Sequence, residues 1–472
     1  MNIFKRLFSS NTLNEIFTPN TVAKLTYVSR TIIEDDLEKY LSLPGKQIVI
    51  YGHSGGGKTT LLRNKLREVE QNFIKTHCES STSFNDLLLQ AFDELNRFYV
   101  SEKTTNTEYT ISSELKAEFS GISSQLNSSI KESNGEKSVR IIPPQLTPQK
   151  LAKFLGEISC VWIIEDFHKV VPEEKKRIAD VVKIFIDAAN DYAKVKIVCI
   201  GAVGTARELI ELDNNLNNRV AELFVPLLTD VEIESIVTKG FELLNVNIDK
   251  DLKEKIVYYS NNLASLTHQI CYDLCFHSNI KRLRFFPKKL NSGSFRVAVN
   301  SYVRKNSDTF TKIYDSIVCQ KYGWNVLKTF EHLEKESLSF DEIKNNIPTS
   351  KRPTDEELIN YLEQVGSAEY KEVIRLDRNS RKYSISSPFF RAFLKMKFAL
   401  EQSEQKEINN KKNKKRHHKF SIDTPHMFEH KFILNDEFLT TYNQVLENII
   451  MNEIKIKRKI IIPKDNKKDE KI

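Results

Sequence analysis

The chain has 472 residues, with 71 lysines and arginines against 63 aspartates and glutamates, so its formal net charge is +8. This length exceeds what a single hydrophobic core organises and predicts about three domains of roughly 150 residues each. Because basic and acidic residues are nearly balanced, composition alone does not indicate a nucleic-acid-binding protein.

The cysteine spacing and the hydropathy of the sequence indicate the compartment in which the protein is expected. Six cysteines lie mostly inside apolar runs, without the paired short spacing of a disulfide framework or a zinc ribbon. No run approaches the ~18 consecutive apolar residues of a membrane span, and the apolar positions of the amino terminus are interrupted. We therefore expect a reduced, cytoplasmic protein without a membrane partner.

The first half of the chain alternates between predicted helices and strands, beginning with a helical pattern over residues 32–41. Strands are expected at 46–52, 72–80, 160–166, 194–204 and 222–228, with helices at 59–69, 83–95 and 175–192 between them. Such alternation predicts a parallel sheet covered on both faces. Residues 101–140 are rich in Ser, Thr, Asn, Lys and Glu, and predict a polar surface insertion that is partly structured at best.

The second half reads differently. Helical patterns at 230–244, 250–260 and 263–275 predict a small helical subdomain, or lid. Residues 300–400 read as three helices, a hairpin at 372–386 and a final helix, which together predict an α+β winged-helix domain. The run "KKNKKRHHK" at 411–419 looks like a basic linker, followed by a short helix and a strand candidate at 454–462.

These patterns predict five regions. They are an amino-terminal linker at 1–36, an α/β core at 37–228, the helical lid at 229–285, the winged-helix domain at 286–400, and a basic linker and tail at 401–472.

The stretch "IVIYGHSGGGKTTLLRNKL" carries the strongest motif. Gly52, Gly57, Lys58 and Thr59 fit the P-loop pattern G-x-x-x-x-G-K-[ST], and the loop leaves a predicted strand and opens a predicted helix. Bare backbone lets several N–H groups face a triphosphate, with Lys58 at the β- and γ-phosphates and the Thr59 hydroxyl on Mg²⁺. The expected nucleotide-binding residues are Gly52, His53, Ser54, Gly55, Gly56, Gly57, Lys58, Thr59 and Thr60.

Two acids end the predicted strand "VWIIED". A site of this class needs one carboxylate for the Mg²⁺ shell and another to polarise the attacking water. We assign Glu165 to the metal shell and Asp166 to water activation. Glu165 stands where an aspartate is usual and Asp166 where a glutamate is usual, so the exchanged assignment stays open. A simple role of the two acids in capping the next helix also stays open.

Residues 20–400 resemble the AAA+ and STAND branches of P-loop ATPases, including relatives of replication initiators, on the strength of these motifs. "YVSR", which ends at Arg30, looks like the box before the P-loop that helps enclose adenine in that family. The resemblance implies a sensor near Thr205 and, at Arg219, an arginine that reaches the γ-phosphate of a neighbouring subunit. No second sensor arginine appears in residues 261–269, which implies slow hydrolysis.

The predicted recognition helix of the winged helix starts with Asp355, Glu356 and Glu357, which would face DNA phosphates with the wrong sign. We therefore expect it to contact a partner or effector protein. The predicted hairpin turn and the basic linker leave weak, nonspecific DNA binding open.

The sequence thus predicts a Mg²⁺-dependent, ATP-hydrolysing oligomeric switch that controls a partner protein. Its likeness to uncharacterised bacterial ATPases implies a role in antiphage defence. The alternative is a DNA-binding initiator or loader of the AAA+ class. A GTPase is disfavoured because no N-K-x-D motif follows the acidic strand.

Overall fold

The computed structural model describes residues 11–99, 113–128, 146–203, 205–211, 213–333, 335–378 and 380–417. Contacts along the chain define a first compact unit of residues 1–404 and a second unit that begins at Gln405. Within the described residues, no helix is both long and apolar enough to cross a bilayer. The strand expected in the tail at 454–462 and the short helix expected before it lie outside the described residues.

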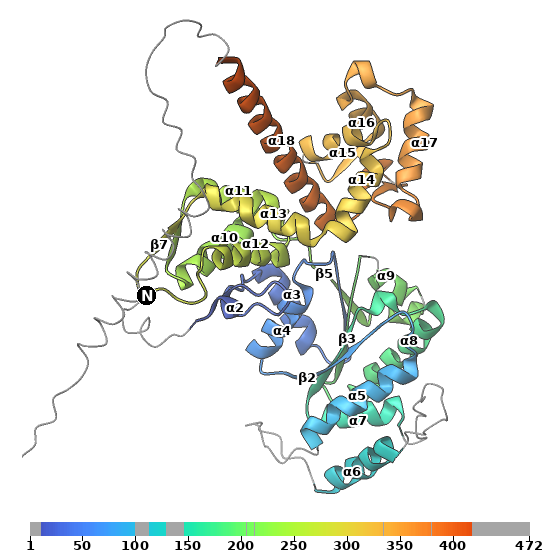
Figure 1. Ribbon diagram of the computed structural model, residues 1–472. Helices are drawn as coiled ribbons and strands as arrows, with labels where there is room; N and C mark the ends of the chain where they lie inside the picture. Colours follow the sequence, from blue (N-terminus) through green and yellow to red (C-terminus); the bar gives the residue numbers. More distant parts are fainter. Residues whose placement is uncertain are drawn as a thin grey trace, which may run out of the picture. The chain divides into compact units, whose positions relative to one another are not determined.

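A five-stranded parallel sheet forms the centre of the amino-terminal half, as the alternating pattern predicted (Figure 1). The strands lie in the order β2-β3-β4-β1-β5. Their bounds are β1 Gln47–Tyr51, β2 Asn72–His77, β3 Cys160–Glu165, β4 Lys196–Gly201 and β5 Val220–Phe224. The register pairs Ile50 of β1 with Ile200 and with Leu223, so β1 lies between β4 and β5. The carboxyl ends of β1, β3 and β4 therefore meet at one edge of the sheet.

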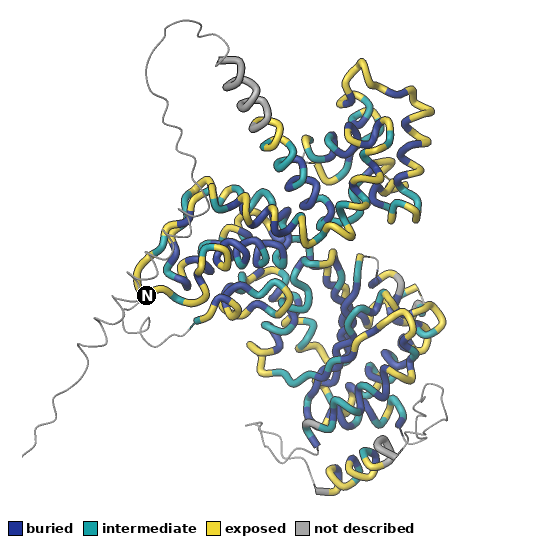
Figure 2. Tube along the Cα trace, viewed as in Figure 1, coloured by how far each residue is buried: buried dark blue, intermediate teal, exposed yellow. Residues whose placement is uncertain are grey.

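Helices cover both faces of this sheet because its strands are apolar on both sides. Ile48 and Ile50 pack on one face, under α3 (Thr31–Ser42) and α4 (Lys58–Glu68). Val49 and Trp162 pack on the other face, in the core shared with five further helices. Those helices are α5 Phe84–Tyr99, α6 Ser113–Ser128, α7 Pro148–Glu157, α8 Pro172–Ala188 and α9 Thr205–Ile210. Figure 2 shows the strands as a continuous buried zone.

Helix α6 departs from the expectation of a polar insertion. Its Phe119 is fully buried and stacks on Tyr99 of α5 with ring centroids 4.7 Å apart. Leu115 and Ile122 are buried on the same face, at the i−4 and i+3 positions of Phe119. Three apolar residues in a polar stretch are enough for one buried face, but too few to give a sustained pattern.

The predicted lid consists of α10 (Asp230–Leu243), α11 (Lys250–Ser260) and α12 (Ala264–His277). Thr229 begins α10 with a reciprocal capping box, in which its hydroxyl accepts from Glu232 N and the Glu232 carboxylate accepts from Thr229 N. Two short strands, β6 (Val246–Ile248) and β7 (Lys288–Leu290), pair in parallel beside these helices. Each has three residues, and this is too short for a sequence pattern to reveal.

The carboxyl-terminal part of the first unit shares one continuous buried core with the lid. Its helices are α13 Phe295–Lys305, α14 Lys312–Val318, α15 Gly323–His332, α16 Phe340–Asn346, α17 Asp355–Val365 and α18 Pro388–His417. Its strands are β8 Ser337–Ser339, β9 Ile374–Asp377 and β10 Lys382–Ile385, arranged antiparallel in the order β8-β10-β9. The hairpin is therefore where the sequence placed it, and β8 is added. Helix α18 runs on to His417, so residues 401–417 are helical where a linker was expected.

Candidate functional site

A glycine-rich loop joins β1 to α4 at the carboxyl edge of the sheet. Gly52, Gly55 and Gly57 have φ angles of +149°, +78° and +88°, a region in which side chains with a Cβ are strained. A Cβ on Gly52 would also collide with the carbonyl of Val225. Gly57 occupies the N-cap position of α4, and the next residue, Lys58, opens the helix. The loop thus brings its backbone N–H groups and a helix amino terminus together.

The Lys58 ammonium group lies within this loop. Its Nζ donates to the carbonyls of Gly52 and His53, at 2.9 and 2.8 Å. Burial lowers the pKa of Lys58, and the carboxylate of Asp166 partly offsets that effect. The cation is therefore held at the mouth of the glycine loop and faces the acids at the end of β3.

The two predicted acids differ in their surroundings. Glu165 ends β3 with its side chain 13% exposed, and its Oε2 lies 3.4 Å from Lys75 Nζ and 3.3 Å from His77 Nδ1. Its Oε1 is buried and has no hydrogen-bond partner among the described residues. Asp166 has a φ of +60° and accepts from Lys169 Nζ at 2.7 Å. One carboxylate oxygen thus remains without a partner in the interior, where a cation or a donor is needed to satisfy it.

A pocket of about 270 Å³ brings these groups together with the lid. It is lined by the P-loop, both acids, the segment before α3, and residues of α10 and α12. Two hydroxyls at the pocket, Thr18 Oγ1 and Ser265 Oγ, come from segments far apart in the sequence. Both are buried and have no hydrogen-bond partner among the described residues. Buried hydroxyls of this kind usually have a partner, so the pocket offers a polar ligand at least three unused contacts, counting Glu165 Oε1.

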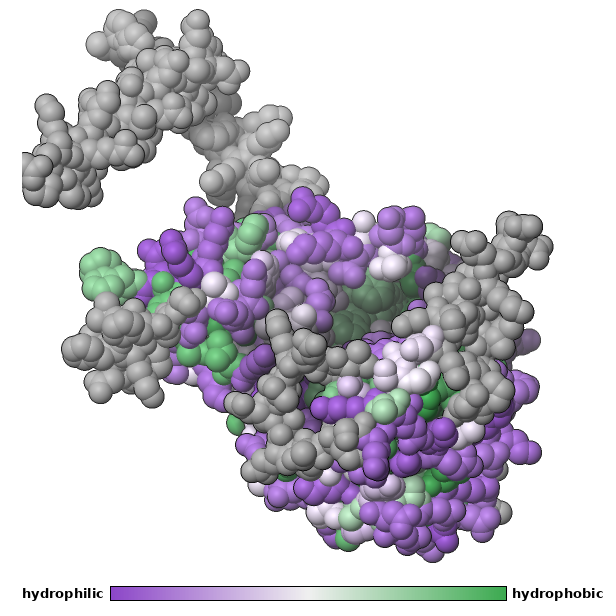
Figure 3. Space-filling model, turned by 90° about the horizontal axis from the view of Figure 1, so that it is seen from below, coloured by the Kyte–Doolittle hydropathy of each residue, from purple (hydrophilic) through white to green (hydrophobic). Residues whose placement is uncertain are grey.

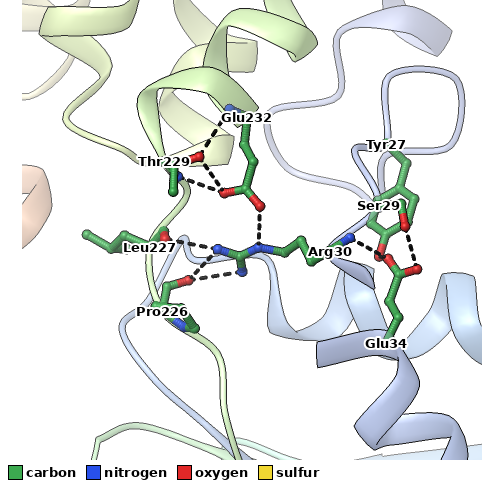
Figure 4. A network of polar contacts seen from close by, with 8 residues as sticks. All are labelled: Tyr27, Ser29, Arg30, Glu34, Pro226, Leu227, Thr229 and Glu232. Atoms are coloured by element: carbon green, nitrogen blue, oxygen red, sulfur yellow. Dashed lines mark hydrogen bonds and ion pairs between the residues drawn. The ribbon is translucent and has the colours of Figure 1, made fainter. Parts of the chain in front are cut away.

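Arg30 lines the pocket, but its guanidinium faces the start of the lid (Figure 4). It donates to Pro226 O from both terminal nitrogens at 3.0 Å and to Leu227 O at 2.9 Å. Its Nε lies 3.2 Å from a carboxylate oxygen of Glu232, the same residue that caps α10. Arg30 therefore ties the base of α3 to the strand-to-lid connection. We call these contacts the Arg30 network.

A second carboxylate fixes the other side of the Arg30 network. Glu34 accepts from the Tyr27 hydroxyl, from Ser29 Oγ at 2.7 Å and from Arg30 N at 2.9 Å. Burial alone would raise the pKa of Glu34, but the hydrogen bonds from Tyr27, Ser29 and Arg30 lower it below its usual value. The "YVSR" segment is thus held in one conformation where it lines the pocket.

His268 of α12 also lines the pocket, although its sequence context gave no reason to select it. Its Nδ1 accepts from Thr18 N at 3.1 Å, and its ring packs edge-on against Phe17 at 6.0 Å. Burial lowers the pKa of His268 to about 4, so the ring is neutral at pH 7. It joins the lid to the segment before α3, and only the tertiary structure reveals that contact.

The two residues implied by the family resemblance lie away from the pocket. Thr205 is fully buried at the start of α9, where its Oγ1 donates to Ala202 O at 2.6 Å, and it is not among the pocket-lining residues. Arg219 is exposed just before β5, and its carbonyl accepts from Gln47 N at 2.9 Å. Gln47 begins β1, whereas the P-loop follows the end of β1, roughly 17 Å away at ~3.3 Å per residue. Arg219 thus lies at the opposite edge of the sheet from the phosphate loop of its own chain.

Comparison with known proteins agrees with this geometry. Residues 44–211 match the family model described as "AAA domain". Together with the parallel sheet and the P-loop, this match fits a P-loop AAA+ NTPase fold, a fold that implies nucleotide binding. No curated protein matches the chain in sequence.

Three solved structures are similar to the chain. A Walker-type ATPase of Pyrococcus abyssi is 14% identical, covering 78% of this chain and 96% of its own, with a TM-score of 0.48. The ORC2 protein of Aeropyrum pernix is 12% identical, covering 84% and 100%, with a TM-score of 0.45. The RuvB Holliday junction branch migration motor of Thermotoga maritima is 12% identical, covering 77% and 94%, with a TM-score of 0.36. At these values the similarities do not bear on what this chain binds or acts on.

Proposed function

We propose that this protein is an ATP-hydrolysing AAA+ switch in which the carboxyl-terminal module reads the state of the P-loop. The observation that carries the proposal is a direct contact between the two. A Cβ placed on Gly55 would lie 2.7 Å from Phe389 Cζ of α18 and 2.9 Å from Leu263 Cδ2 of the lid. The glycine loop that would hold phosphates is thus covered by the first turn of α18.

One further contact and one electrostatic effect support this coupling. Asn261 Nδ2, at the end of α11, donates to the carbonyl of Pro388 at 3.1 Å. Burial lowers the pKa of His53 in the P-loop, and the carboxylate of Glu336, just before β8, partly offsets that effect. Residues 323–385 follow the helix-strand-helix-helix-strand-strand order of a winged helix, which we propose it to be. A rearrangement of the P-loop on nucleotide binding would then act directly on the carboxyl-terminal module, through the residues that contact the loop.

The described residues suit Mg·ATP. Lys58 and the glycine loop would hold the phosphates, and Thr59 and Glu165 would hold Mg²⁺, which supplies positive charge beside the phosphates when bound. The partnerless Glu165 Oε1 fits such a cation, and the hydroxyls of Thr18 and Ser265 fit the polar groups of a nucleoside. Asp166, half-exposed beside Lys58, is proposed to polarise the attacking water.

We propose that hydrolysis needs a second copy of the chain. Arg219 is exposed and its side chain makes no hydrogen bond or ion pair with another described residue. It cannot reach the P-loop of its own chain from the far edge of the sheet. A guanidinium supplied across an interface would make turnover depend on assembly. Thr205, which is buried and donates to the carbonyl of Ala202, would act only through the backbone that follows β4.

The output is proposed to go to a partner protein. Helix α17, in the recognition position, begins with the exposed acids Asp355, Glu356 and Glu357, which repel phosphates. DNA binding remains a second candidate because the hairpin turn exposes Arg378 and Arg381. None of the described residues bears on the role in antiphage defence, which stays a prediction.

Sedimentation velocity with ATP, with ADP and without nucleotide tests the switch. We expect ATP to promote self-association of the native chain and Arg219→Ala to lower ATPase activity without weakening nucleotide binding. Arg177→Ala, an exposed arginine on α8, is the matched control and should behave as the native chain. A chain that binds ATP yet hydrolyses it equally fast at all protein concentrations would refute the assembly requirement.

The role of α18 has its own test. Phe389→Ala removes the ring that covers Gly55, so the exchange of α18 amides with deuterium should no longer differ between the ATP-bound and free forms. Phe276→Ala, an exposed ring on α12, is the control and should preserve the difference. If native α18 exchanges equally with and without ATP, the carboxyl-terminal module does not read the nucleotide.

A further inference from the structure

A loop between α12 and β7 exposes two phenylalanines. Phe285 is 80% exposed and Phe286 is 72% exposed, although large apolar side chains are normally covered. Their rings meet edge to face, with centroids 5.0 Å apart and planes at 84°. The pair is therefore a small aromatic platform on the surface, and no described side chain covers it.

The same loop and the first two residues of β7 carry a dense positive charge. Residues 281–289, which we call the aromatic–basic loop, contain Lys281, Arg282, Arg284, Lys288 and Lys289 and no acidic residue. None of these five cations forms an ion pair with another residue of the described part of the chain. Lys288 Nζ donates to Ser278 O, which leaves the other four cations for an external partner. Figure 3 shows hydrophobic atoms projecting among hydrophilic ones on the side where Figure 1 labels β7.

The backbone of the aromatic–basic loop is fixed from two sides. Toward the amino-terminal segment, Leu283 N donates to Asn11 O at 3.0 Å and Leu13 N donates to Lys281 O at 2.9 Å. Toward the lid, Asn245 Nδ2 donates to the carbonyls of Arg284 and Phe285, at 3.0 and 3.2 Å. The rings are thus held outward by the fold, and little conformational freedom would be lost when a ligand packs on them.

We propose that the aromatic–basic loop is a docking surface for single-stranded nucleic acid. Single strands are bound by cations that follow the phosphates and by aromatic rings on which bases stack, and this loop combines both within nine residues. A duplex would hide its base faces from the two rings. The inference does not depend on the ATPase function, because none of its residues lines the nucleotide pocket.

An anionic membrane surface is the competing partner for a basic, aromatic loop. Two phenylalanines bury about 300 to 500 Å² between them, so they would give only a marginal membrane anchor. A membrane and a single strand would use different properties of the two rings. A membrane needs only apolar surface, whereas stacking needs the aromatic face.

Leucine substitutions exploit this difference. Fluorescence anisotropy of a labelled oligothymidine of about 20 nucleotides, longer than one typical site, measures affinity for the native chain and for Phe285→Leu/Phe286→Leu. We expect the variant to bind at least about 30-fold more weakly, the factor for two stacked bases at the lower end of the known range. Because both rings are exposed, thermal unfolding should be unchanged, which shows that the variant folds.

Charge variants locate the phosphate contacts. Replacing Lys281, Arg282, Arg284 and Lys289 by glutamine should reduce the slope of log K against log salt by about 3, at about 0.7 per phosphate on a single strand. The matched control replaces Arg375, Arg378, Arg381 and Lys382 of the hairpin by glutamine, and should leave the slope unchanged. A loss of binding in the control alone would place the site at the hairpin and overturn the proposal.

Three further results would overturn it. One is absence of oligothymidine binding to the native chain even at low salt, with ATP binding intact. Another is binding to vesicles of phosphatidylcholine and phosphatidylserine that survives Phe285→Leu/Phe286→Leu, without any binding of the oligonucleotide. The third is tighter binding of duplex than of single strand, which would exclude stacking on the two rings. Failure of ATP binding in the native chain would instead refute the proposed ATPase and leave this inference standing.

Discussion

The Arg30 network should govern how firmly the lid is joined to the core, and Arg30→Ala tests it. The side chain of Arg30 is only 7% exposed, and the substitution removes the charged donor of two backbone carbonyls, Pro226 O and Leu227 O. It also removes the ion pair with Glu232. Breaking a network of this kind costs about 3 kcal/mol, because buried acceptors lose their charged partner.

Glu232→Gln is the matched control. A glutamine at this position can still accept from Thr229 N, so the cap of α10 is kept and only the charge of the pair is lost. We expect it to cost about 1 kcal/mol or less, since Glu232 is 20% exposed and partly screened. The difference between the two variants separates the carbonyl contacts from the ion pair.

Hydrogen–deuterium exchange of residues 226–236 is the suitable assay, because a chain with several cores need not unfold in one step. Exchange there should speed up roughly 100-fold in Arg30→Ala and about tenfold or less in Glu232→Gln, as these free energies imply. Unchanged exchange in Arg30→Ala would refute the argument. Equal acceleration in both variants would mean that the ion pair, and not the carbonyl contacts, joins the lid to the core.

Three further predictions concern the pocket, and a fourth concerns Arg219 and assembly. Lys58→Ala should abolish measurable ATP binding in a filter assay, because the charge beside the γ-phosphate is lost. Asp166→Asn should still bind Mg·ATP but turn over roughly 100-fold more slowly, and if Glu165→Gln alone stops turnover, the two roles are exchanged. The pKa of His268 is about 4 in the folded chain, so the free energy of unfolding should decrease as the pH falls from 6.5 to 4, because His268 of the unfolded chain takes up its proton first. In His268→Gln that part of the pH dependence of the melting temperature should disappear. Arg219→Lys should not restore the assembly-dependent ATPase activity lost in Arg219→Ala, because a planar guanidinium is required.

Local patterns predicted the core of the fold well. The strand "QIVIY" is buried on both faces and β-branched, so its place in the sheet follows from its composition. The P-loop could be recognised because its glycines are required by the backbone itself, as the φ angles of Gly52 and Gly57 show. Glu165 and Asp166 followed from their position after a buried strand. In each case the cause lies within a few neighbouring residues.

The remaining parts depend on contacts between distant residues. Arg30 lines the pocket, and the partners that hold its guanidinium lie some 200 positions further along the chain, at Pro226 and Glu232. His268 is held by Thr18, and Gly55 is covered by Phe389. None of these pairs leaves a signal in the spacing of the sequence. The exposure of Phe285 and Phe286 could not be predicted either, because two adjacent apolar residues next to a short strand normally indicate a buried segment.

Helix α12 has a mechanical consequence. Its first two turns place Ser265 and His268 at the pocket, and its last residue leads through Ser278 into the aromatic–basic loop. With 14 residues it is about 20 Å long, so a rotation of roughly 5° about the pocket end moves the far end by about 2 Å. Helix α12 thus connects the nucleotide pocket, at its amino-terminal end, with the aromatic–basic loop that follows its carboxyl-terminal end. A rotation of the lid over the pocket would therefore also move Phe285 and Phe286.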